Sequence, residues 1–344
     1  MIPRETKDII NIKESLFDSN DKIITIAGLS KNAGKTSFLN YLIKSYQSPY
    51  QLAITTTGHD GEDTDFLTGL KKPKIKLKAG NYFTTIASVI KNHPGSVRLI
   101  KKLSVSVLSQ AIFLAQTVEN IETEIFGALH MEDQIKLCHE IQAENIPYII
   151  IDGSLDRKSV ALSPEVNKII LVASPVVGNI EQLSKQLTQL YCLSRIPCSD
   201  IHIADDNCFS YQINQKMLKT EIHSFFKNES ELLAILKHHP DIIYIPGAIT
   251  DHVMNRFKNI FNEFQGTLII KHPLHLMCNP FHLELLLKKN IKSLHPFPLN
   301  AFILNSYSVD NNHLHSDILL NSIQTLFQNI PVIDIQNLLF NSIS

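Results

Sequence analysis

Short apolar runs alternate with stretches of helical periodicity along most of the chain. Strands are predicted at residues 22–27 (KIITIA), 51–57, 112–116, 147–152 (PYIIID) and 168–173 (KIILVA), and helices at 34–46, 131–144 and 180–193. Because most of these strands are apolar on both faces, they are typical of a parallel sheet that helices cover on both sides. The pattern predicts an α/β fold with a doubly wound, mainly parallel sheet.

The periodicity weakens over residues 197–239, where two helical pieces are expected, and a second alternating block follows. Its predicted strands are 241–245, 267–271, 301–304 and 331–335, with helices at 250–263, 280–289 and 315–328 between them. We therefore predict a first domain over residues 1–235 and a C-terminal α/β region over 236–344. The alternative is that the terminal block extends the first sheet.

Composition excludes several classes of protein. The 344 residues are 44% hydrophobic and 19% charged, and the formal net charge of −1 gives no basic field for nucleic acid or an anionic membrane. No apolar run reaches the length of a membrane span, and residues 1–20 do not resemble a signal peptide. The five cysteines include no CxxC pair, so we expect free thiols and a cytoplasmic protein.

The strongest chemical signal follows the first predicted strand, where the chain reads GLSKNAGKTS. A strand, a glycine-containing turn and a helix N-terminus together place backbone N–H groups and the positive end of the helix dipole around a phosphate. Lys35 is expected to reach the β- and γ-phosphates and Thr36 to bind Mg²⁺. Gly28 and Gly34 are separated by five residues, whereas the common phosphate-loop pattern has four. The candidate nucleotide-binding residues are Ser30, Lys31, Asn32, Ala33, Gly34, Lys35, Thr36 and Ser37.

Carboxylates that could complete a magnesium site follow two other predicted strands. Asp152 ends the buried run YIIID, at the sheet edge where ligands bind in open α/β folds, although it could also cap the following turn. An acidic loop, GHDGEDTD (58–65), follows the second strand and is either a solvated loop or a switch segment. We select Asp60 as a catalytic residue and Asp63 as a metal ligand, with Thr57 beside them; the other predicted catalytic residues are Lys35 and Asp152.

Other clusters have weaker interpretations. The alternation KIKLK at 74–78 is typical of an edge strand with one wet, lysine-bearing face, or of a pocket in which Lys76 or Lys78 binds an acidic substrate. Asn305 follows a predicted strand and either begins a turn or contacts a nucleotide base. His272, His275 and Cys278 have loose metal-like spacing, but a fourth ligand is not apparent.

The five-residue spacer before GKT resembles the branch of P-loop proteins that contains dethiobiotin synthetase, the cobyric-acid amidases and the MinD and nitrogenase iron-protein group. This resemblance covers about residues 20–195. It implies ATP and Mg²⁺ as cofactors, a parallel sheet and, in many members, a homodimer around ATP. The signature lysine with which many members reach the partner's nucleotide would fall on Ser30 here, so a trans-acting lysine is not expected at that position.

A narrower resemblance rests on SKNAGKTSFLN (30–40), TTTGHDGEDTDF (55–66) and IIDGSLDRKS (150–159). These segments are similar to P-loop ATPases that accompany adenosylcobalamin-dependent lysine and ornithine aminomutases. The resemblance implies an ATP-driven reactivating factor that exchanges damaged cobalamin on the mutase, with a second ATPase subunit as a partner.

Three functions are therefore open. The first is an ATP hydrolase that acts as an accessory factor for a partner enzyme. The second is an ATP-dependent biosynthetic ligase of the dethiobiotin synthetase type, and the third is a nucleotide-binding protein without useful hydrolysis. A guanine-reading NKxD motif is not evident, which favours ATP.

Overall fold

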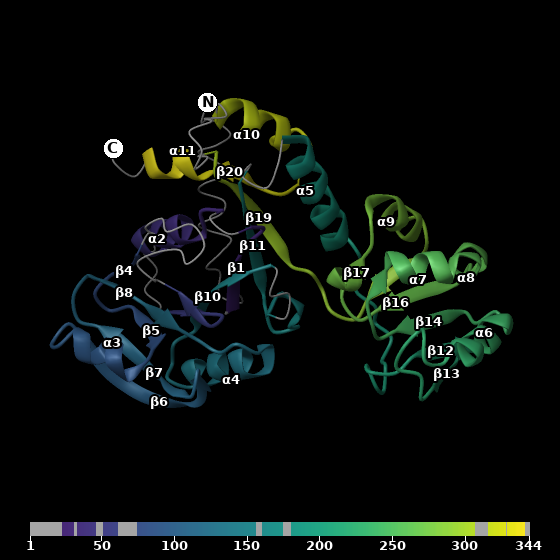
Figure 1. Cartoon of the computed structure of the whole chain (residues 1–344), viewed down its shortest axis with the longest axis horizontal. Helices are drawn as coiled ribbons and strands as arrows, with labels where there is room; N and C mark the ends of the chain where they lie inside the picture. The colour runs from purple at the N-terminus through teal and green to yellow at the C-terminus, as the bar shows by residue number, and fades with distance from the viewer. Residues whose placement is uncertain are drawn as a thin grey trace. The chain divides into compact units, whose positions relative to one another are not determined.

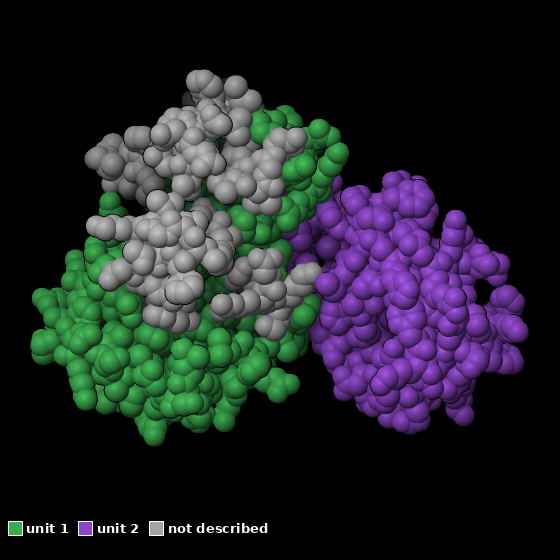
Figure 2. Space-filling view, in the orientation of Figure 1, with its two compact units in different colours: residues 1–186, 298–344 green, residues 187–297 purple. Residues whose placement is uncertain are grey.

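A computed structural model describes residues 23–30, 33–45, 51–60, 74–155, 160–174, 180–306, 316–327 and 329–340 (Figure 1). Contacts divide the chain into two compact units (Figure 2). Unit 1 comprises residues 1–186 and 298–344, and unit 2 comprises residues 187–297. The predicted boundary at residue 235 lies inside unit 2. The chain returns to unit 1 after it, because the strands near 300 and 332 pair with the first sheet.

Unit 1 is an α/β unit built on a large mixed sheet. Its nine strands lie in the order β20-β19-β11-β1-β10-β2-β5-β7-β6. Their bounds are β1 Ile23–Gly28, β2 Leu52–Thr56, β5 Tyr82–Thr85, β6 Val97–Val107, β7 Gln110–Thr117, β10 Tyr148–Ser154, β11 Lys168–Ala173, β19 Leu299–Leu304 and β20 Val332–Asp334. The pairs from β20 to β5 are parallel, whereas β5 with β7 and β7 with β6 are antiparallel.

The helices of unit 1 are α2 Lys35–Ser45, α3 Ala87–Asn92, α4 Met131–Gln142, α10 Ser316–Gln324 and α11 Ile335–Phe340, and α5 Ile180–Ser194 runs from unit 1 into unit 2. Two small ladders join β3 His59–Asp60 to β9 Ile125–Phe126 and β4 Ile75–Leu77 to β8 Ile121–Thr123, and a 3-10 turn covers Val160–Leu162.

All six residues of β1 are buried. The apolar side of α2 supplies Phe38, Leu39 and Leu42 to a cluster with Ile24 and Ile26 of β1. The two faces of β1 are therefore both covered, as a strand in the interior of a layered sheet requires.

Unit 2 has its own five-stranded sheet, in the order β13-β12-β14-β16-β18. The strands are β12 Ser210–Ile213, β13 Lys216–Lys219, β14 Ile242–Ile245, β16 Thr267–Ile270 and β18 Ile291–Ser293, and β14, β16 and β18 are parallel. The helices are α6 Glu229–Lys237, α7 Asp251–Arg256, α8 Lys258–Glu263 and α9 Pro280–Leu287; β15 Ile249–Thr250 pairs with β17 Leu276–Met277 after the 3-10 turn Pro273–His275.

The prediction of two helical pieces within 197–239 was wrong for the first of them, because β12 and β13 form a hairpin there. Asn214 and Gln215, with φ of 51° and 62°, make its two-residue turn in the left-handed region that such hairpins need.

Candidate functional site

The turn between β1 and α2 requires glycine at two positions. Gly34 has a φ of +98°, and its carbonyl accepts from Phe38 N at 3.0 Å, so the helix begins directly after it. A Cβ at Gly34 would lie 2.8 Å from Nδ2 of Asn305, and a Cβ at Gly28 would lie 2.8 Å from Cδ of Lys35. The backbone therefore passes close to both side chains, which leaves no room for a larger residue at either glycine.

Lys35 and Asp152 lie together at the carboxyl end of β1 and β10. The Nζ atom of Lys35 is 3.8 Å from Oδ1 of Asp152, whose side chain is 1% exposed. The backbone carbonyl of Asp152 accepts from Thr57 N at 3.0 Å and from Thr56 Oγ1 at 3.0 Å, which fixes its main chain against the end of β2. At 3.8 Å the two side chains form an ion pair rather than a direct hydrogen bond. The structure thus brings together two residues that the sequence analysis assigns to one site.

The other predicted nucleotide-binding residues surround the start of α2. Ser30 follows β1, and its Oγ is buried without a hydrogen-bond partner in the described part of the chain. Ala33 is buried, while Thr36 and Ser37 are half-buried in the first turn of the helix. Free N–H groups and the positive dipole end of an eleven-residue helix lie at this turn, a suitable place for an anion. Lys31 and Asn32 lie outside the described residues.

The acidic loop is described only at its start. The backbone of His59 and Asp60 pairs with Phe126 and Ile125 in the β3–β9 ladder. The side chain of Asp60 and the whole of Asp63 lie outside the described residues, so their predicted roles remain predictions. The preceding residue, Gly58, has a φ of +92° and bonds to Ala128 and Gly127 through its N–H and carbonyl groups.

A buried polar network supports the end of β2 just before this loop. Gln134 of α4 is fully buried, its Oε1 accepts from Ala128 N at 2.8 Å, and its Nε2 donates to Thr55 Oγ1 at 3.2 Å. Thr84 of β5 also donates to Thr55, at 2.7 Å. These bonds satisfy groups that would be costly to bury unpaired, and they fix the strand end from which the acidic loop leaves.

Two further side chains lie at the same strand ends on the other side of β1. Asn305 directly follows β19, its N–H donates to Ala173 O at 2.8 Å, and its amide group packs on Gly34. Asp334 is fully buried at the end of β20, opposite Leu304. Sequence reasoning placed Asn305 at a strand end but missed Asp334, although the motif PVIDI carries the same signal as YIIID. The parallel pairing of β19 and β20 with β11 is what brings both to this edge.

The lysine-bearing strand is confirmed, and its lysines have structural partners. In β4, Ile75 and Leu77 are buried and Lys76 is exposed, as the alternation predicts. Lys76 pairs with Glu122 at 3.3 Å, and Lys78 Nζ donates to the carbonyl of Lys44 near the C-terminal end of α2. That carbonyl is about 14 Å along the helix from Lys35, given 1.5 Å per residue. Lys78 is thus bonded at the end of α2 opposite the glycine turn.

The described residues contain no group of three or more His, Cys, Asp or Glu side chains suited to a metal ion. His272, His275 and Cys278 are among the residues searched, and they do not form such a group.

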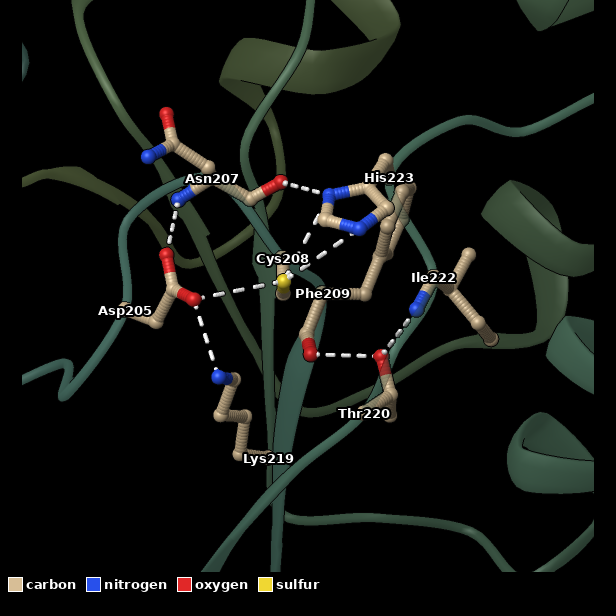
Figure 3. A network of polar contacts seen from close by, with 8 residues as sticks. All are labelled: Asp205, Asn207, Cys208, Phe209, Lys219, Thr220, Ile222 and His223. Atoms are coloured by element: carbon tan, nitrogen blue, oxygen red, sulfur yellow. Dashed lines mark hydrogen bonds and ion pairs between the residues drawn. The ribbon is translucent and has the colours of Figure 1, made fainter.

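Cys208 of unit 2 contacts Asp205 and His223, each at 3.5 Å, in the arrangement drawn in Figure 3. Burial and the neighbouring Asp205 raise the pKa of this thiol, and His223 Nδ1 lies 3.0 Å from the Asn207 carbonyl. A raised pKa does not favour the thiolate that a nucleophilic cysteine needs.

Comparison with protein-family models, curated proteins and solved structures finds no match to this chain. None of the helices in the described ranges has the length and apolar character that a bilayer crossing requires.

Proposed function

We propose that the protein is a Mg-ATP-binding P-loop ATPase that acts as an accessory factor for a partner enzyme. The observation that carries the proposal is the ion pair of Lys35 with the buried carboxylate of Asp152, 3.8 Å apart beside a turn that requires glycine. A lysine at the first position of the helix and a strand-end aspartate are the two charged groups that phosphoryl transfer needs on the protein.

Different residues of the chain have different roles in the proposed hydrolysis of ATP. Lys35 moves from Asp152 to the γ-phosphate oxygens, where its charge stabilises the transition state. Thr36 and Asp152 are the residues that would hold Mg²⁺, and a bound Mg²⁺ would supply positive charge that neutralises the phosphates. The segment from Gly58 onward, with Asp60 and Asp63, orients the attacking water and responds to the γ-phosphate as a switch.

The strand order of the large sheet supports the fold side of the proposal. We propose that the sheet is the doubly wound, mainly parallel type, with β6 and β7 added at one edge. The parallel neighbours of β1 are β10 on one side and β11 on the other. The chain passes from β1 to β2 on one side of the sheet and from β10 to β11 on the other, so its connections diverge between β1 and β10, the kind of place where open α/β sheets bind ligands.

A partner protein is part of the proposal because the narrower resemblance of the sequence implies one. The resemblance to aminomutase-associated ATPases supplies the candidate: a cobalamin-dependent aminomutase with its second ATPase subunit, and a homodimer of this chain is the competing assembly. The ligase alternative has less support, since it relied on Lys76 and Lys78, which contact Glu122 and the far end of α2.

Release of phosphate from ATP tests the assignment of the metal ligands. We expect Mg²⁺-dependent turnover that falls roughly 100-fold or more in Asp152→Asn, because it removes charge from the metal site. Thr36→Ala should raise the Mg²⁺ concentration needed for half-maximal turnover. Lys76→Ala, an exposed charge change in the same unit, is the matched control and should turn over at the wild-type rate. Equal turnover in Asp152→Asn and wild type would exclude Asp152 from the metal site.

A further inference from the structure

Unit 2 contains an open cavity of about 520 Å³ that the nucleotide site does not involve. It lies at the carboxyl edge of the parallel strands β14, β16 and β18. Leu294 and His295 line it directly after β18, and Lys219 lines it from the end of β13. The opposite wall is the segment Ser199–Asp206. This volume and position are usual for small-molecule sites in α/β proteins.

The wall segment is held across the strand ends at both of its own ends. Ser199 N donates to the carbonyl of Ser293 in β18 at 2.8 Å, and the Tyr244 hydroxyl of β14 donates to the carbonyl of Asp206 at 2.8 Å. Backbone bonds from Leu294 and His295 to residues 270 and 271 join the ends of β18 and β16 beneath it. The cavity is therefore formed by fixed elements of the fold.

Three charged side chains line the cavity, those of Asp205, Asp206 and Lys219. The carboxylate of Asp205 already has three hydrogen-bond or ion-pair contacts. Asp205 accepts from Lys219 Nζ at 2.9 Å, from Asn207 N at 3.0 Å and from Cys208 Sγ at 3.5 Å (Figure 3). These donors hold the pKa of Asp205 at about 2, with Lys219 the largest cause. Asp205 is thus a fixed anion with little capacity for another donor.

The remaining two charges have spare capacity and opposite signs. Lys219 has three N–H donors, of which Asp205 takes one. Asp206 pairs with Lys271 Nζ at 2.9 Å through one oxygen, and a carboxylate offers about four acceptor positions. Burial lowers the pKa of the neighbouring His295, and Lys271 lowers it further against the effect of Asp206, so its imidazole is neutral near pH 7.

We propose that this cavity binds a small zwitterion, with the ligand's ammonium group on Asp206 and its carboxylate group on Lys219. A simple anion would face Asp205 and Asp206, and a simple cation would face Lys219. A ligand of both charges meets one opposite charge at each end.

Calorimetry on the full chain tests this, with the protein α-amino acids, β-alanine and γ-aminobutyrate as probes. We expect at least one probe to saturate the protein, and the preferred spacing of its charges reports the distance that the site spans. The N-acetyl and amide derivatives of that probe, which each keep one charge, should bind about tenfold more weakly or worse, since each loses a charge-assisted contact. Absence of saturation by every zwitterion, or equal binding of the derivatives, would overturn the proposal.

Variants locate the site. Asp206→Asn and Lys219→Gln should each weaken binding about tenfold or more, because each removes one of the two charged contacts. The matched controls are Glu284→Gln and Lys288→Gln, which remove an exposed ion pair of 2.7 Å elsewhere in unit 2 and should bind as wild type. Circular dichroism checks that each variant is folded. If a variant does not fold, the binding of the N-acetyl and amide derivatives to wild type still tests the proposal. The proposal does not depend on nucleotide binding, so either can fail alone.

Discussion

Gly34 combines two requirements that can be separated experimentally. Its φ of +98° disfavours any side chain, and Asn305 fills the space that a Cβ would occupy. Gly80 has a similar φ of +88° but has no atom within 4 Å of such a Cβ among the described residues. The two glycines are a matched pair in which only one has a crowded neighbour.

We expect Gly34→Ala to lower the free energy of unfolding by more than Gly80→Ala, which carries only the left-handed cost of about 1–2 kcal/mol. The additional loss is the clash with Asn305, and Asn305→Ala in the Gly34→Ala background should recover part of it, since it removes the amide group but keeps the Cβ atom. Urea denaturation of the four proteins measures both quantities. Equal losses at the two glycines would mean that the Asn305 contact does not restrict position 34.

At the residue scale, a site residue could be predicted from the sequence where the segment around it was sufficient to place it. Lys35 could be predicted because it begins a helix after a strand and a glycine-containing turn, and Asp152 because it ends an apolar run. The contact between Gly34 and Asn305 could not be, because it depends on which strands become neighbours of β1. The same applies to Asp334, which reaches the site edge only through the pairing of β20 with β19.

Among the elements, α4 and the end of β2 are joined by the buried side chain of Gln134. Replacing it with Leu keeps most of the volume but leaves Ala128 N without its acceptor and removes a donor from Thr55. We expect Gln134→Leu to lower the free energy of unfolding by about 1–3 kcal/mol, the usual cost of an unsatisfied buried group. Thermal or urea unfolding checks this, with Lys136→Gln on the exposed side of α4 as the control. A loss no larger than that of the control would show that the network adds little.

The elements that the sequence predicted well are those whose two faces are buried. The parallel strands β1, β2, β10 and β11 appear as continuous apolar runs, so their existence and type were predicted correctly. The strand β6 and the β12–β13 hairpin were missed, because their residues alternate between buried and exposed or are mostly half-buried. Such strands are defined by their partners more than by their own pattern.

At the scale of the whole molecule, the order of the elements along the chain concealed the domain organisation. The sequence shows strand–helix alternation on both sides of residue 240, and nothing local distinguishes strands of one sheet from strands of another. The return of β19 and β20 to the first sheet makes unit 2 an insertion in unit 1. The alternative that the terminal block extends the first sheet holds for β19 and β20, whereas β14, β16 and β18 belong to the second sheet.

The central claim is that Lys35 and the turn before it bind the phosphates of a nucleotide. The most direct test is calorimetric titration of ATP and GTP, each with Mg²⁺, into wild type and Lys35→Ala, with Lys76→Ala as the control for loss of a lysine in the same unit. We predict that wild type and the control bind ATP more tightly than GTP, and that Lys35→Ala loses about 1.5–3 kcal/mol of binding free energy, the value of a charge-assisted contact. Failure of wild type to bind either nucleotide, or equal binding by Lys35→Ala, would contradict the assignment of the phosphate site.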